Sequence, residues 1–203
     1  MKMKILEQAS SLFLEYGFKS VTMDDLSERL GVSKKTIYEH FDTKTQLVKE
    51  TTDHIFDNIS GIIDDLCDQN LDPIEETLAI KNQVMKHLKN EMSSPQFQLQ
   101  KYYPEISMSL KHKQWDKMYE CYRNNLKRGI ELGYYRDGID VECIFRFYYN
   151  GMNMVKDKKV FPHQEFSTSH VNDQYLEYHL RGIATTKGLK RLEELLSEST
   201  TTS

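Results

Sequence analysis

Apolar residues recur along this chain at helical spacing, and no segment alternates apolar and polar residues in the manner of an exposed strand. The chain has four prolines, and none lies in the first 72 residues. Long proline-free stretches allow helices to continue without a missing backbone donor. We therefore expect an all-α protein.

The first apolar stripe runs for about four helical turns and stops at Gly17. Its members are Ile5, Leu6, Ala9, Leu12, Phe13 and Tyr16. Thr22 offers a hydroxyl at a helix start, and Asp25 follows three residues later, at the spacing of a capping box. These signals predict a first helix that ends at Gly17 and a short second helix that ends at Gly31.

A third short helix is predicted directly after the glycine turn "LGVS". Ser33 can cap this helix at its start. Ile37 and Phe41 lie four residues apart, so they share one face of the helix. We expect this face to be buried and the opposite face to be exposed.

Longer helices follow. Thr43 and Gln46 again have capping-box spacing, which predicts a helix from about Lys44 to Gln69. Segment 133–138, "GYYRDG", is the clearest turn in the rest of the chain, and residues 161–170 are predicted to form a loop. Five more helices are predicted, near residues 73–92, 95–110, 111–132, 140–158 and 171–197.

Composition is that of an ordinary globular protein, because 203 residues with 38% hydrophobic content can form the core of one large or two modest domains. The three cysteines, Cys67, Cys121 and Cys143, are far apart and form no CxxC pair, which argues against a disulfide framework or a zinc site. No apolar run approaches the roughly 20 residues needed to span a bilayer. Reduced thiols and the lack of a secretory pattern lead us to expect a cytoplasmic protein.

A net charge of −4 argues against indiscriminate coating of nucleic acid, so any contact with DNA must be local. A short helix, a glycine turn and a second short helix form the helix-turn-helix plan, whose second helix enters the major groove. The outward residues of that helix are Lys34, Lys35, Thr36, Tyr38 and His40. Between Arg29 and Lys44 the net charge is only +2, which is weak electrostatic steering. The alternative is that these lysines form a solvated face and Tyr38 a packing residue.

Segment 22–48, "TMDDLSERLGVSKKTIYEHFDTKTQLV", resembles the N-terminal signature of the TetR/AcrR family of bacterial transcriptional regulators, without gaps. The resemblance implies a TetR-like fold of about nine helices. It further implies a three-helix DNA-binding domain over residues 1–46 and a helical effector-binding and dimerisation domain over residues 47–203. Ser27 stands where the family usually has alanine, and Lys35 where it often has glycine.

By this resemblance, one set of residues contacts the DNA backbone: Thr22, Lys34, Thr36, Tyr38, His40 and Lys44. A second set lies near the bases: Ser33, Lys35 and Thr36. Lys44 also opens a helix, where the helix dipole disfavours a cation unless a phosphate docks there as well.

Most of the aromatic residues lie in the second part of the chain, between Phe97 and Tyr178. Segment 144–155, "IFRFYYNGMNMV", is apolar on nearly every side, so both of its faces must be covered. The resemblance implies that the last two helices pair with a second subunit. We therefore expect a homodimer through the helices near 140–158 and 171–197.

The resemblance also implies a small-molecule pocket among the middle helices, and pockets favour aromatic and methionine walls. Candidate lining residues are Tyr103, Trp115, Met118, Tyr119, Tyr122, Phe145, Tyr149 and Met152. These residues could also simply fill a core. Because no local run of basic residues is present, a neutral or hydrophobic effector is favoured over a polyanion.

The chain contains no HExxH, GxSxG, Walker or GxGxxG motif, so we expect no catalytic residues, no bound metal and no cofactor. Our interpretation is a DNA-binding repressor that a small molecule releases from its operator. One alternative is a TetR-like DNA-binding protein that a protein partner controls, or that acts architecturally without a ligand. Another is a helical enzyme that kept the DNA-reading fold.

Overall fold

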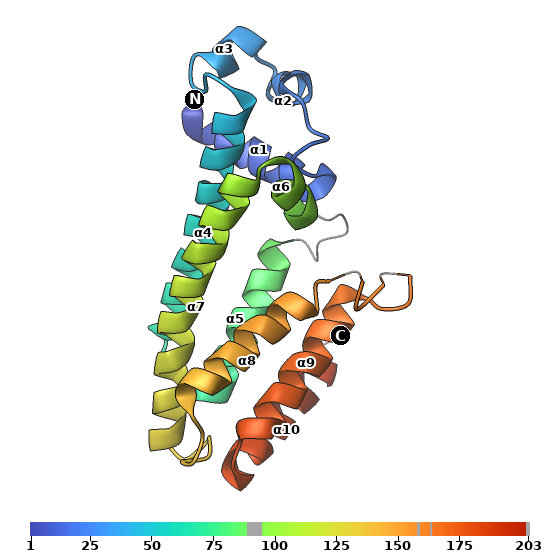
Figure 1. The fold of residues 1–203 in the computed structure, drawn as a ribbon. Coiled ribbons are helices and arrows are strands. Elements are labelled where there is room, and N and C mark those ends of the chain that lie inside the picture. Colours follow the sequence, from blue (N-terminus) through green and yellow to red (C-terminus); the bar gives the residue numbers. More distant parts are fainter. Residues whose placement is uncertain (89–94, 158, 163, 202–203) are drawn as a thin grey trace. The chain divides into compact units, whose positions relative to one another are not determined.

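A computed structural model of the chain describes residues 1–88, 95–157, 159–162 and 164–201, with side chains as far as residue 198. These residues form ten helices and one isolated bridge between Tyr135 and Ala184 (Figure 1). In chain order the helices are α1 (Lys2–Tyr16), α2 (Met23–Leu30), α3 (Lys34–Tyr38), α4 (Lys44–Cys67), α5 (Pro73–His87), α6 (Pro95–Tyr102), α7 (Pro104–Glu131), α8 (Val141–Met154), α9 (Thr168–Ile183) and α10 (Thr186–Thr201). None of the described helices combines the length and the apolar character needed to cross a membrane.

The chain packs into two compact units. The N-terminal unit comprises Met1–Gly61 and Lys86–Gln114, and the C-terminal unit comprises Ile62–Met85 and Trp115–Ser203. Helices α4 and α7 each contribute residues to both units. The division predicted after residue 46 separates two functions rather than two packing units, and it stays a prediction.

The N-terminal unit is built around an apolar core to which α1 contributes one face. Ile37 and Phe41, predicted to face inward, are fully buried in this core. Gly31 ends α2 in the left-handed region, with φ of 65°, as a glycine after a helix commonly does. Together these contacts hold the short helices α2 and α3 against α1 and the start of α4.

Side-chain caps determine where α2 and α4 begin. Thr22 accepts a hydrogen bond from the Asp25 backbone N–H, and the Asp25 carboxylate accepts one from the Thr22 N–H, so the predicted capping box is present. At α4, Thr43 Oγ1 accepts from the Gln46 N–H at 3.1 Å. The helix predicted from Lys44 begins there and ends at Cys67, close to its predicted end.

Two predicted boundaries were wrong in the middle of the chain, where helices over 95–110 and 111–132 were expected. The chain instead breaks at Tyr103, between α6 and α7. Pro104 disfavours the helical conformation of the residue before it and tolerates the first position of a helix, so the break falls at the proline. Of the helix predicted over 73–92, the described part ends at His87, and residues 89–92 lie outside the described residues.

The helix predicted over 171–197 is two helices, so ten replace the nine expected. Ala184 is extended, with ψ of 151°, and pairs with Tyr135 across the isolated bridge. Thr185 Oγ1 then accepts a hydrogen bond from the Gly188 N–H at 3.2 Å, which caps the start of α10. Helix α9 begins at Thr168, inside the segment predicted as a loop over 161–170.

The C-terminal unit has its own apolar core, formed by residues of α5 and of α7 to α10. The predicted turn at 133–138 is present, and the Tyr134 and Tyr135 N–H groups both donate to the Gly129 carbonyl. A side chain at Gly129 would collide with the ring of Tyr135, since its Cβ would lie 2.1 Å from that ring. This glycine allows the turn to fold back tightly onto α7.

Candidate functional site

The eight residues predicted to face DNA all lie in the N-terminal unit, on or beside α2, α3 and the first turn of α4. Thr22, Ser33, Lys34, Lys35 and Tyr38 are exposed, and the other three, Thr36, His40 and Lys44, are half-buried. The inward face of α3 is taken up by Ile37, so these polar side chains are left at the surface. The structure thus brings the predicted residues onto neighbouring elements of one unit.

The hydroxyl groups of this surface have a structural task as well. Ser33 Oγ accepts a hydrogen bond from the Thr36 N–H at 3.1 Å and lies 2.9 Å from Thr36 Oγ1, which caps α3. A hydroxyl has one donor and two acceptor positions. Because Ser33 is exposed, part of this capacity remains available to a phosphate or a base edge.

The two lysines at the start of α3 differ in their surroundings. Lys34 Nζ lies 2.5 Å from an Asp24 carboxylate oxygen, and both side chains are about half exposed or more. Lys35 is exposed, and its ammonium group makes no ion pair or hydrogen bond with the other described residues. An exposed pair contributes only about 0–1 kcal/mol, so a phosphate can compete with Asp24 for Lys34.

Lys44 is more restrained than the other lysines of this surface. Its ammonium group donates to the Lys19 carbonyl at 3.1 Å. Burial and the charge of Lys19 lower the pKa of Lys44, while the Asp25 carboxylate opposes that shift. An anion beside this ammonium group would therefore favour the charged form.

A small cavity of about 50 Å³ lies within the C-terminal unit. Of the predicted pocket residues, Met118 and Tyr122 line it, together with Glu76 and Cys121. The cavity is small for a drug-sized ligand, since ligand pockets commonly measure about 300–1,000 Å³.

Most of the other predicted pocket residues pack on each other instead. The ring of Trp115 lies edge-on against Phe145 at 4.9 Å and against Tyr149 at 4.7 Å, and Tyr119 contacts Phe145 at 5.1 Å. Met152 packs partly buried against the same core. Tyr103 belongs to the N-terminal unit and packs against that unit's core, so the structure does not bring it to the cavity.

Comparisons with known proteins point to the same segment of the chain. Residues 5–51, which contain all eight residues predicted to face DNA, match the family described as bacterial regulatory proteins of the tetR family. The chain is 26% identical over 186 residues to the HTH-type transcriptional repressor KstR2 of Mycobacterium tuberculosis, covering 89% of this chain and 91% of that protein. Together these matches support a transcriptional regulator of the TetR family.

Two further similarities fit a TetR-family regulator. Over 63 residues the chain is 35% identical to IcaR of Staphylococcus aureus, a negative transcriptional regulator of the biofilm operon icaADBC, covering 31% of this chain and 34% of that protein. The fold resembles that of the regulator FadR from Bacillus subtilis, solved in complex with stearoyl-CoA. The TM-score is 0.67 at 16% identity, covering 90% of this chain and all of that one.

The structure adds residues to the surface predicted to face DNA that the sequence did not indicate. The Lys19 N–H donates to Gln98 Oε1 at 2.8 Å, and the Lys19 carbonyl accepts from Lys44. Gly17, with φ of 89°, accommodates the Gln98 side chain, because a Cβ there would lie 2.2 Å from it. The sequence offers little sign of this contact, because Gln98 lies 79 residues from Lys19 and matches no motif.

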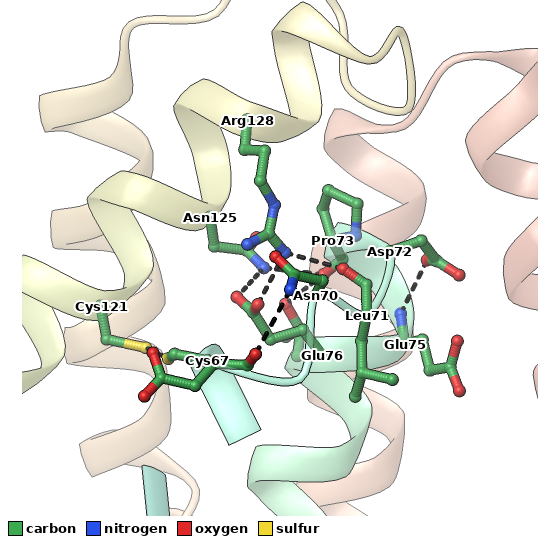
Figure 2. A network of polar contacts seen from close by, with 12 residues as sticks. Cys67, Asn70, Leu71, Asp72, Pro73, Glu75, Glu76, Cys121, Asn125 and Arg128 are labelled. Carbon is green, nitrogen blue, oxygen red and sulfur yellow. Dashed lines mark hydrogen bonds and ion pairs between the residues drawn. The ribbon is translucent and has the colours of Figure 1, made fainter. Parts of the chain in front are cut away.

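A buried polar network beside the cavity was also not predicted (Figure 2). The Glu76 side chain is only 2% exposed, and Arg128 Nη2 donates to its Oε2 at 2.6 Å. Asn125 Nδ2 donates to Glu76 Oε1 at 2.7 Å and to the Pro73 carbonyl at 2.8 Å. Arg128 also donates to the Leu71 carbonyl, so the network ties the turn between α4 and α5 to α7.

A buried histidine completes the polar interior of the C-terminal unit. His179 Nε2 lies 2.7 Å from Tyr122 Oη, and its ring packs against Tyr148. Burial lowers the pKa of His179 to about 4. The imidazole is therefore neutral at physiological pH and can accept a hydrogen bond from Tyr122.

Among the described residues, no group of three or more histidine, cysteine, aspartate or glutamate side chains could hold a metal ion.

Proposed function

We propose that this TetR-family regulator is a repressor that binds a DNA operator as a homodimer and is released by a small neutral or hydrophobic effector. In this proposal residues 1–46 bind DNA, and residues 47–203 bind the effector and form the dimer. The observation that carries the DNA role is the exposed polar face of α3 beside Lys44, within the segment that matches the family.

We assign the DNA contacts as follows. Lys44 holds a phosphate at the start of α4, where the helix N-terminus and the ammonium group both attract an anion. Lys34, Thr22, Tyr38 and His40 add backbone contacts. Lys35, Ser33 and Thr36 lie at the start of α3, which is the end of a recognition helix that approaches the base edges.

The dimer is assigned to α8 together with α9 and α10. Phe147 and Met154 of α8 are 67% and 45% exposed, and Tyr178 of α9 is 77% exposed. Large apolar side chains at a surface favour a covered state. A two-fold axis at this surface would give two copies of α3 for one operator.

The effector site is assigned to the C-terminal cavity, whose walls include Met118 and Tyr122. Because the cavity is small, effector binding must widen it, and this widening would move α4 and change the spacing of the two recognition helices. Coupling of this kind is typically worth about 1–3 kcal/mol and is reciprocal. An effector that bound free and operator-bound protein equally well in calorimetry would contradict the coupling.

The small cavity also favours the second candidate, a TetR-like DNA-binding protein controlled by a protein partner or acting architecturally. The aromatic residues that could line a pocket largely pack on each other. Calorimetry with neutral and hydrophobic compounds separates the two candidates. Only the first candidate predicts a saturable heat of binding when such a compound is added to the protein.

The DNA role is tested with a duplex that the protein itself selects from a random pool. Lys44→Ala should weaken binding to all duplexes and reduce the slope of log affinity against log salt by about one, since one phosphate contact is lost. Circular dichroism on the variant controls for folding. An unchanged slope would contradict the phosphate assignment.

Lys35→Ala should change which duplexes are preferred, because an exposed lysine at the start of α3 can reach the acceptors of guanine. Repeating the selection with the variant measures this preference. A uniform loss of affinity, with the same selected sequence, would show that Lys35 contacts no base.

A further inference from the structure

We propose that Cys67 and Cys121 form a dithiol site that a hydroperoxide oxidises to an intramolecular disulfide. Cys67 is the last residue of α4, and Cys121 lies on α7, both within the C-terminal unit. Their Sγ atoms are 3.1 Å apart, and Figure 2 shows the two side chains meeting. A disulfide bond measures about 2.05 Å, so the sulfurs need to approach by only about 1 Å.

The local structure allows this approach. Cys67 ends its helix, and the chain then turns through Asn70, whose φ of 54° is left-handed. Beyond the turn, the Leu71 and Pro73 carbonyls are held by Arg128 and Asn125. The final turn of α4 can therefore adjust while the segment that follows stays anchored to α7.

The chemistry balances with one equivalent of hydroperoxide. The Cys67 thiolate, the less buried of the two sulfurs, attacks the peroxide oxygen, which breaks the O–O bond and releases an alcohol or water. The resulting Cys67 sulfenic acid then condenses with the Cys121 thiol. The S–S bond forms, and the sulfenic oxygen leaves as water with the Cys121 proton. Two electrons from the sulfurs have then reduced the peroxide.

Several charged groups surround the pair. Burial is the main cause that raises the pKa of both thiols, and the carboxylates of Asp64 on α4 and Glu76 on α5 raise that of Cys67 further. Lys117 on α7 acts in the opposite direction. Because the thiolate is the reactive form, the oxidation should be slow at neutral pH and accelerate about tenfold per pH unit below the thiol pKa.

The disulfide would also alter the cavity, because Cys121 lines it beside Tyr122. An effect on effector binding rests on the proposed function, whereas formation of the disulfide does not. The following test therefore measures the bond itself, without DNA or effector.

The reduced full-length protein is treated with hydrogen peroxide, its free thiols are counted, and its peptides are mapped without reduction. We expect the free thiols to fall from the three of the sequence to one, with a peptide pair that joins Cys67 to Cys121 within one chain. Dithiothreitol should restore all three. Raising the pH should increase the rate at which the free thiols are lost.

Serine variants provide matched controls. Cys143→Ser, at an exposed position on α8, should leave the cross-link intact, whereas Cys67→Ser and Cys121→Ser should each abolish it. Circular dichroism checks their folding, and the peptide map of the unsubstituted chain does not depend on them. A cross-link through Cys143, unchanged thiols, or Cys67 found only as sulfinic or sulfonic acid would overturn the proposal.

Discussion

The two units of this chain differ in where they place charged and amide side chains. The N-terminal unit surrounds an apolar core with exposed lysines, hydroxyls and a tyrosine on α3. The C-terminal unit buries a glutamate, two asparagines and a histidine among its aromatic residues. Exposed polar groups contribute little to stability and remain available to a partner. Buried ones must be satisfied within the unit, because an unpaired polar group in a core is destabilising.

This difference separates two kinds of function. A surface that binds DNA needs a rigid support and side chains that are still free, which short capped helices supply. A unit that responds to an effector needs an interior whose contacts can be rearranged. The network around Glu76 ties the turn after α4 to α7, beside the cavity.

The largest loss of stability is expected when the buried carboxylate is removed. Glu76→Ala removes the carboxylate that pairs with the Arg128 guanidinium and accepts from the Asn125 amide, and leaves each only a backbone carbonyl as acceptor. Loss of one member of a buried pair destabilises by about 3–5 kcal/mol. Because Arg128 is partly exposed, we expect about 3 kcal/mol in urea denaturation.

Glu75→Ala is the matched control for that substitution. Glu75 is more exposed than Glu76 and pairs with Arg191, which keeps its second partner, Asp72. We expect a loss of at most about 1 kcal/mol. Equal losses for the two variants would show that the buried network adds no more stability than the exposed ion pair.

Acid should weaken the C-terminal unit through His179. Burial holds its pKa at about 4, below the ordinary value of 6.5, so the unfolded chain binds the proton first as the pH falls. The contribution of His179 is therefore present above pH 6.5 and is lost toward pH 4. Between pH 7 and pH 5 we expect a loss of about 2 kcal/mol.

Denaturation at several pH values measures this dependence. His179→Gln, which does not titrate, should flatten the dependence, whereas His170→Gln, at an exposed position, should leave it unchanged. If the slope of His179→Gln equalled that of the unsubstituted chain, the acid sensitivity would have to come from another group.

The smallest effect is expected at the cap of the DNA-binding unit. Thr22→Ala removes the hydroxyl that accepts from the Asp25 N–H, and loss of such a cap costs about 1 kcal/mol. Thr45→Ala, at an exposed position on α4, should be nearly neutral. Thermal denaturation compares the two. If they were equally stable, the capping box at α2 would be dispensable.

Local signals in the sequence predicted the helices at the start of the N-terminal unit, α1 to α4. Capping residues such as Thr22, Ser33 and Thr43 act on the next turn of chain, so the starts of α2, α3 and α4 could be predicted without any tertiary information. Burial of Ile37 and Phe41 followed from their spacing on one short helix.

The C-terminal unit was less predictable, because its features depend on contacts between distant segments. Glu76 and Arg128 lie 52 residues apart, and neither belongs to a recognisable motif. The break at Ala184 depends on its pairing with Tyr135, although the cap at Thr185 is a local feature of the sequence. Aromatic composition alone could not distinguish the residues that pack on each other from those beside the cavity.

The shortness of α3 limits how much sequence information one copy of this chain can read. In the proposed function, the five residues Lys34–Tyr38 offer only a few side chains to the bases. A genome presents about 10⁶–10⁹ competing sites, and selecting one among 10⁶ requires about ten fully specified base pairs. We therefore expect an operator that repeats a short half-site, so that the information missing from one half is supplied by the other.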